Sequence, residues 1–101
     1  MILELPAVSV IMTVHNGEKY LGDAVKSILN QTFKNFEFII IDDGSTDHCR
    51  EILEKYATKD SRVHLISRGN RGRTKSLNEC LSLARGELIA IMDADDISHF
   101  T

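Results

Sequence analysis

Hydrophobic and polar positions along the chain follow two kinds of pattern, and four apolar runs predict strands. Residues 8–14 (VSVIMTV), 36–41 and 87–92 are almost continuously apolar and rich in β-branched side chains. This pattern is typical of strands that are buried on both faces of a sheet. Residues 62–67 (RVHLIS) are shorter and more polar, and they predict a further strand.

Three segments between these strands repeat apolar residues at helical spacing. The first covers 17–31 and carries one apolar stripe, made of Tyr20, Leu21, Ala24, Val25, Ile28 and Leu29. The second extends to about residue 56 and is expected to be capped by Ser45 or Thr46. The third runs from about 74 to 84, with Gly86 as its expected C-cap. Each helix therefore connects two successive strands.

The order of these elements, βαβαβαβ, predicts an α/β fold. We expect a Rossmann-like, mostly parallel sheet that is flanked by helices and joined by right-handed crossovers. No internal repeat, low-complexity tract or linker divides the 101 residues, so one domain is expected. Ligands of open parallel sheets bind outside the carboxyl ends of the strands. The loops after the first, second and fourth strands are therefore the expected site.

Carboxylates are crowded into two of these loops. DDGSTD (residues 42–47) follows the second strand, and MDADD (92–96) ends the fourth. Like charges brought together on one rim raise each other's pKa and destabilise the fold, and a divalent cation held by oxygen ligands relieves this. MDADD alone fits a solvated acidic turn equally well. Both loops at one edge favour a site for Mn²⁺ or Mg²⁺ shared with a phosphorylated ligand.

The composition excludes several other functions. The chain is 43% hydrophobic and 27% charged, and its net charge of -3, without a basic tail, predicts no nucleic-acid binding. No apolar run approaches the roughly 18 residues of a membrane span, and the start, MILELPAV, does not have the pattern of a secretory signal. Cys49 and Cys80 are expected to be reduced thiols inside helices, and the four scattered histidines do not have the spacing of zinc ligands.

A longer pattern resembles a known family. VSVIMTVHNGEKYLGDAVKSILNQTFKNFEFIIIDDGSTD, then GNRGRTKSLN, then GELIAIMDADD resemble, in order and spacing, the nucleotide-binding half of the family 2 glycosyltransferases with the GT-A fold. The similarity covers residues 8–96. It implies that residues 1–101 are the nucleotide-sugar-binding part of a glycosyltransferase domain. Because the chain ends soon after MDADD, we expect a truncated fragment without the acceptor-binding part.

The resemblance assigns a nucleotide site to the first two loops. It implies that Thr13, Val14 and His15 line the base and that Glu18 lies at the same mouth. Many members have a tyrosine that stacks on uracil where this chain has His15. Asp43 matches the carboxylate that accepts the imide N–H of the base, a group that uracil presents as a donor. Asp42 is expected to support the turn instead.

The end of the fourth strand corresponds to the DxD motif of the family. The motif here is Asp93-Ala94-Asp95. The resemblance implies that Asp95 is the main ligand of Mn²⁺ or Mg²⁺. Asp93 would contact the ribose or water bound to the metal, and Ala94 would lie beside the nucleotide. The cation would stabilise the diphosphate as it leaves the sugar.

The loop before the third helix is basic. Arg71, Arg73 and Lys75 occupy the region where members of the family approach the nucleotide, and cationic side chains there would attract a diphosphate. An exposed basic loop without a ligand explains each of them equally well. Asn78 matches a recurrent asparagine that holds the loop or contacts the ligand.

The implied activity is the metal-dependent transfer of a sugar, with inversion, from a nucleotide donor to an acceptor hydroxyl. The expected donor is a UDP-sugar, and the expected acceptor is a saccharide or a lipid-linked molecule of cell-envelope polysaccharide or glycolipid synthesis. The resemblance places the general base beyond residue 101, so this chain should bind nucleotide without turnover. It also implies a cytoplasmic location, peripheral at the inner face of a membrane. The uncovered last strand invites self-association through its edge.

Other readings remain open. The principal alternative is a non-catalytic α/β fragment that binds metal or nucleotide, or serves only in interactions. A receiver-type regulatory domain would need an aspartate at the end of the third strand, where this chain has Ile66-Ser67-Arg68. A dinucleotide site would need GxGxxG after the first strand, and RGNRGR has neither that spacing nor that position.

Overall fold

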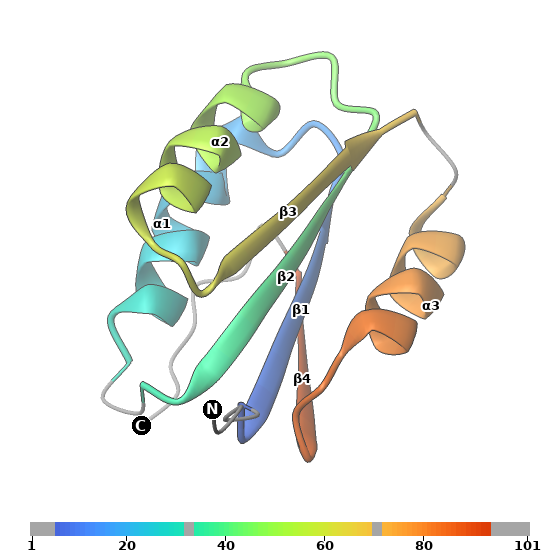
Figure 1. Cartoon of the computed structure of the whole chain (residues 1–101). Helices are drawn as coiled ribbons and strands as arrows, with labels where there is room; N and C mark the ends of the chain where they lie inside the picture. The colour runs from blue at the N-terminus through green and yellow to red at the C-terminus, as the bar shows by residue number, and fades with distance from the viewer. Residues whose placement is uncertain (1–5, 32–33, 70–71, 94–101) are drawn as a thin grey trace.

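The order of strands and helices is the predicted one (Figure 1). The computed structural model describes residues 6–31, 34–69 and 72–93. Its elements are β1 (Val8–Val14), α1 (Glu18–Leu29), β2 (Phe36–Asp43), α2 (Cys49–Lys59), β3 (Val63–Arg68), α3 (Arg73–Leu83) and β4 (Leu88–Asp93). The predicted strand bounds differ from these by two residues at most.

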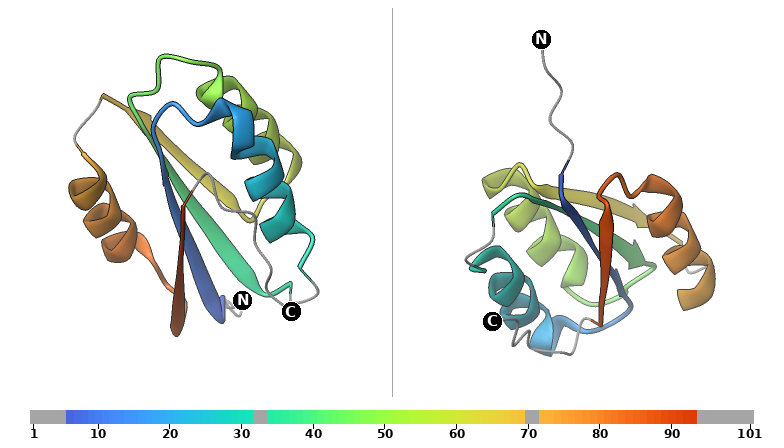
Figure 2. Two further views of the ribbon diagram at one scale, coloured as in Figure 1. Left: turned by 180° about the vertical axis from the view of Figure 1, so that it is seen from behind. Right: turned by 90° about the horizontal axis from the view of Figure 1, so that it is seen from below.

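The four strands form one parallel sheet in the order β3-β2-β1-β4. Thr13 of β1 lies opposite Ile41 of β2 and Asp93 of β4. The carboxyl ends of these three strands therefore meet at one edge of the sheet. Helices α1 and α2 cover one face, and α3 covers the other (Figures 1 and 2).

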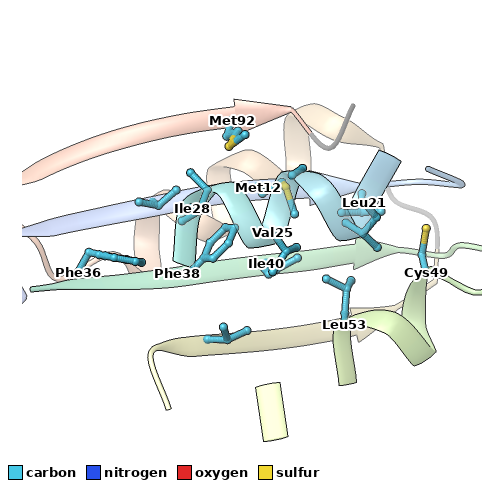
Figure 3. Packing of buried hydrophobic residues seen from close by; sticks show 14 residues of the cluster. Met12, Leu21, Val25, Ile28, Phe36, Phe38, Ile40, Cys49, Leu53 and Met92 are labelled. Carbon is cyan, nitrogen blue, oxygen red and sulfur yellow. The ribbon is translucent and has the colours of Figure 1, made fainter. Parts of the chain in front are cut away.

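The larger hydrophobic core lies between the sheet and helices α1 and α2 (Figure 3). Its buried members are Val10, Met12, Val14, Leu21, Ala24, Val25, Ile28, Phe36, Phe38, Ile40, Cys49, Leu53, Val63 and Met92. The stripe predicted for α1 supplies four of them, because i, i+3, i+4 and i+7 spacing places these side chains on one side of a helix. Tyr20 was expected in this stripe, but it lies at its border and is 45% exposed.

The core under α3 is smaller. Ile11, Ile39, Ile41 and Cys80 are its buried members, and Ile66, Leu77 and Ala84 pack against it partly buried. Leu81 shares the helical spacing of Leu77 and Ala84 but is 40% exposed. Helix α3 thus turns a narrow face toward the sheet.

Helix α2 begins later than the sequence predicts. Its first residue is Cys49 and its N-cap is His48, so Ser45 and Thr46 are not its caps. The backbone N–H of Cys49 instead donates to Asp47 Oδ1 at 3.0 Å. Ser45 and Thr46 hydrogen-bond to the loop after β1, as described below, and this interaction delays the helix.

The role predicted for Gly86 is wrong. The C-cap of α3 is Ala84, and Gly86 lies where the chain passes close to β1. A Cβ at this position would come within 2.6 Å of the Ser9 backbone nitrogen and 2.7 Å of the Val8 carbonyl carbon. The glycine is required by this close approach, not by the end of the helix.

A buried carboxylate also stabilises this close approach between β1 and the segment that follows α3. Glu37 of β2 is 4% exposed and accepts hydrogen bonds from Ser9 Oγ at 2.5 Å and from the Arg85 backbone N–H at 2.7 Å. Arg85 Nε donates to its other oxygen at 3.2 Å. Burial raises the pKa of Glu37, but these hydrogen bonds and the positive charge of Arg85 outweigh it and lower the pKa overall. A buried carboxylate with these partners is stable as the ion.

Candidate functional site

The carboxyl ends of the strands form the candidate site. The loop after β1, residues 15–17, and the loop after β2, residues 44–48, lie side by side there, joined by hydrogen bonds. The N-terminus of α3 reaches the same edge through a hydrogen bond to Asp43. Strand β4 ends there with Asp93, as its pairing with β1 requires. The structure thus brings the loops after β1 and β2 together with the end of β4 at one edge of the sheet.

Asp42 and Asp43 are buried, with exposed fractions of 2% and 4%, and successive side chains of a strand point to opposite faces. On the side of α1 and α2, Asp42 Oδ1 accepts the backbone N–H of Ser45 at 3.2 Å, and its Oδ2 lies 3.5 Å from Ser67 Oγ. Gly44 has a φ of 73°, which a glycine adopts without strain. Asp42 therefore supports the turn, and this prediction is confirmed.

Asp43 joins the first loop to the third helix. Its Oδ2 accepts the backbone N–H of Gly72, the N-cap of α3, at 3.0 Å. Its carbonyl oxygen lies 2.8 Å from His15 Nδ1. Gly72 has a φ of 91°, a conformation that favours glycine. The carboxylate is consequently held in one place at the edge of the sheet.

The first two loops are joined by asparagine, serine and threonine. Asn16 has a positive φ of 54°, and its backbone N–H donates to Ser45 Oγ at 3.0 Å. Asn16 Oδ1 accepts the backbone N–H of Thr46 at 2.7 Å. These three residues were not among those predicted for the site. Their residue types were a signal, because asparagine tolerates the left-handed conformation and Asn, Ser and Thr side chains commonly hydrogen-bond to backbone in loops.

Glu18 is held on the side of the second loop. Its backbone N–H donates to Asp47 Oδ2 at 3.1 Å, and its carboxylate pairs with His48 Nδ1 at 2.9 Å. The hydrogen bond and the charge of Glu18 raise the pKa of His48. Both side chains are exposed, so the pair is a weak constraint. The contact of Glu18 with a nucleotide remains a prediction.

The thiol of Cys49 lies beneath the two loops. It is buried and accepts the backbone N–H of Gly17 at 3.2 Å. Burial, together with a smaller effect of the Asp47 side chain, raises its pKa to about 11. A thiol with this pKa stays protonated and is a poor nucleophile. Cys80 is also buried, and both cysteines lie in helices as predicted.

Other predicted residues lie at the edge in different ways. Thr13 is partly buried, whereas Val14 is 1% exposed and packs in the core, so only its backbone can face a ligand. Lys75 and Asn78 are exposed on the first two turns of α3. Arg73 begins this helix, but its side chain lies outside the described residues.

The DxD motif is described only in part. The backbone of Asp93 ends β4 beside Thr13, and its side chain lies outside the described residues, as do Ala94 and Asp95. Within 6–31, 34–69 and 72–93, no group of three or more His, Cys, Asp or Glu side chains is arranged to hold a metal ion. The assignment of Asp93 and Asp95 as metal ligands thus remains a prediction. In these same ranges no helix has the length and apolar character to cross a bilayer.

The comparison with known families identifies the class of protein. A family model described as "Glycosyl transferase family 2" matches residues 9–100. The chain therefore belongs to glycosyltransferase family 2, as the resemblance predicted.

Curated relatives agree with this assignment. "Putative glycosyltransferase EpsH" of Bacillus subtilis (strain 168) is 43% identical over 94 residues, which cover 93% of this chain and 27% of the relative. "Glycosyltransferase GlyG" of Streptococcus pneumoniae is 42% identical over 91 residues, 89% of this chain and 30% of the relative. "Putative teichuronic acid biosynthesis glycosyltransferase TuaG" of Bacillus subtilis is 40% identical, over 90% of this chain and 36% of the relative. The chain thus spans roughly a third of the length of these relatives.

Solved structures share the fold. Mannosyltransferase PcManGT from Pyrobaculum calidifontis, in complex with GDP-Man and Mn2+, has a TM-score of 0.80 and 25% identity over 96% of this chain and 30% of its own. S. aureus TarS 1-349 has a TM-score of 0.80 and 35% identity over 88% of this chain and 27% of its own. The fold is the GT-A type, and the predicted fold class is confirmed.

Proposed function

We propose that this chain is the nucleotide-sugar-binding portion of a glycosyltransferase, and that the carboxyl edge of its sheet binds the nucleoside diphosphate of the donor. The observation that carries the proposal is Asp43. Its carboxylate is buried, is fixed by Gly72, and lies at the edge where β4 ends with Asp93. A fixed carboxylate is a suitable acceptor for the N–H of a base, and burial strengthens such a bond.

The proposed donor is a UDP-sugar. Uracil presents one imide N–H, which a carboxylate accepts. TarS 1-349 has also been solved in complex with UDP, with a TM-score of 0.72 and 32% identity over 87% of this chain and 27% of its own. The PcManGT structure holds GDP-Man, and guanine likewise presents N–H donors. UDP and GDP are therefore the two nucleotides to compare.

A divalent cation, Mn²⁺ or Mg²⁺, fits this edge as a cofactor. Strand β4 delivers Asp93 to it, and carboxylate oxygens are the ligands that these hard cations prefer. We propose Asp95 as the main ligand and Asp93 as its neighbour. When bound, the cation would supply Lewis-acid stabilisation of the leaving diphosphate. Lys75 and Arg73, in the first turn of α3, would add positive charge, and the helix N-terminus itself favours an anion.

The proposed reaction of the whole enzyme is transfer of the sugar to an acceptor hydroxyl with inversion. The general base and the acceptor site would belong to sequence that the relatives have beyond the matched region. By analogy with TuaG, whose name assigns it to teichuronic acid biosynthesis, we place the enzyme in cell-envelope polysaccharide or glycolipid synthesis. The acceptor would be a saccharide or a lipid-linked molecule, reached from the cytoplasmic face of the membrane.

Replacement of Asp43 tests the site directly. In Asp43→Asn the amide oxygen can still accept the N–H of Gly72, but the charge is lost. We expect UDP to bind at least tenfold more weakly, because a hydrogen bond to a charged group contributes about 1.5–3 kcal/mol. Asp23→Asn, at an exposed position of α1, is the matched control and should bind UDP as the natural chain does. Equal UDP affinity in folded Asp43→Asn would contradict the proposal.

We also propose that two copies of the 101-residue chain associate through β4. Among the described residues this strand pairs only with β1, and Leu88, Ile89 and Ile91 are 67%, 46% and 53% exposed. The opposite edge strand, β3, instead exposes His64 and Ser67. A parallel strand that is apolar on both faces is normally covered. Two such edges can complete each other by pairing across a twofold axis.

A further inference from the structure

The side chain of Asn16 has only one orientation that satisfies its neighbours. The backbone N–H of Thr46 approaches one branch of the amide at 2.7 Å, and the Thr46 hydroxyl lies 3.3 Å from the same atom. An N–H can donate only to the oxygen, so this branch is Oδ1. The NH₂ group of Asn16 therefore points the other way.

That NH₂ group determines the state of the neighbouring imidazole. Asn16 Nδ2 lies 3.4 Å from His15 Nε2, and an amide NH₂ can only donate, so Nε2 must accept. On the other side of the ring, His15 Nδ1 lies 2.8 Å from the carbonyl oxygen of Asp43, which can only accept. Both contacts require the neutral tautomer with the proton on Nδ1. Two independent contacts thus specify the same form of the ring.

We propose that Asn16 is a positioning residue. Its Oδ1 is held by the backbone of Thr46 in the second loop, and its NH₂ group in turn holds the imidazole of His15 in the Nδ1–H tautomer. Both ring nitrogens are then engaged by the protein, and the ring offers its face to a ligand. Resting on the proposed function, this makes His15 a stacking surface for the base. Stacking is tolerant of base identity, so discrimination between bases falls to Asp43.

The tautomer can be measured without any nucleotide. Long-range ¹H–¹⁵N NMR of the 101-residue chain at about pH 8, where neutral imidazoles predominate, distinguishes the two forms. We expect His15 to carry its proton on Nδ1. Asn16→Asp keeps an acceptor for Thr46 and tolerates the positive φ, but it places an acceptor instead of a donor beside Nε2. Protonation of Nε2 should therefore gain population, although the Asp43 carbonyl still favours a proton on Nδ1. Asn35→Asp, an exposed change before β2, is the control and should leave the tautomer unchanged.

Nucleotide binding tests the consequence. Asn16→Gly accommodates the φ of 54° without charge and removes the amide, and it should weaken UDP and GDP by the same factor, roughly 3–10-fold. In the His15→Phe background, which has a ring face but no ring nitrogen, the same change should have no further effect. A full Asn16→Gly effect in that background would overturn the inference.

The two measurements separate this inference from the function on which it rests. A wild-type His15 protonated only on Nε2, or an Asn16→Asp variant in which the population of Nε2 protonation is unchanged, overturns the positioning role even if the chain binds nucleotide. The expected tautomers in a chain that binds neither UDP nor GDP support the role of Asn16 and overturn the proposed function instead.

Discussion

Single residues at the edge of the sheet gain their properties from partners that are distant in sequence. Glu18 and His48 come from the ends of two different loops and form an ion pair at 2.9 Å. Asp43 accepts a backbone N–H from Gly72, which is 29 residues away. The sequence shows which side chains can make such contacts, but not which of them meet, since that depends on how the loops fold against each other.

The pair of Glu18 and His48 predicts a titration. The hydrogen bond and charge of Glu18 raise the pKa of His48 above its ordinary value of 6.5. The pair therefore stabilises the fold below pH 6.5, and this contribution is lost as the pH rises through the raised pKa. NMR titration should give a pKa above 6.5 for His48 and a lower one in Glu18→Gln. Glu54→Gln, whose partner is Arg50, should leave it unchanged; an equal shift in both variants would count against the pair.

Helices and strands were predicted well where burial alone determines them. The strands β1 and β2 and the buried stripe of α1 follow from apolar patterns, because each must hide one or two faces from water. The predicted start of α2 was wrong because Ser45 and Thr46 hydrogen-bond to Asn16 and do not cap the helix. Helix-capping propensity is judged from one segment at a time. It therefore does not account for hydrogen bonds to another loop that draw a capping residue away from the helix.

Replacing either of two glycines with alanine should change the stability of the fold, but in opposite directions. Gly86→Ala places a Cβ within 2.6 Å of the backbone of Ser9, and it should lower the free energy of unfolding by about 1–3 kcal/mol or more. Gly22→Ala lies inside α1 and meets no atom within 4 Å, so it should raise the free energy of unfolding by about 0.5–1 kcal/mol. Urea unfolding measures both. Equal stability of the two variants would contradict the close approach at Gly86.

At the scale of the molecule, the sheet topology explains why the position of the site could be predicted from the sequence although its individual contacts could not. Parallel strands must end at the same edge, so the loops after β1, β2 and β4 were expected together. The strand ends and the loops after β1 and β2 confirm this, and the loop after β4 lies outside the described residues. The contacts among Asn16, Ser45 and Thr46 could not be predicted, because they depend on the exact turn of each loop. The metal ligands remain a prediction from the family motif.

The contrast between the two edges of the sheet predicts the oligomeric state. Light scattering of the 101-residue chain should show a concentration-dependent dimer. Ile91→Lys on β4 should give a monomer, because a charged side chain on an exposed edge opposes strand pairing. His64→Lys on β3 adds the same charge at the other edge and should leave the dimer intact. A monomeric natural chain at all concentrations, or equal loss of the dimer in both variants, would contradict association through β4.

The central claim is that the carboxyl edge of the sheet holds a nucleoside diphosphate together with a divalent cation. Calorimetric titration of UDP, with and without Mn²⁺, into the natural chain and into Asp93→Asn tests it most directly. We predict that Mn²⁺ tightens UDP binding by roughly tenfold or more, about 1.4 kcal/mol, and that Asp93→Asn abolishes most of this gain. UDP binding that responds neither to Mn²⁺ nor to the loss of the Asp93 carboxylate, or no binding at all, would contradict it.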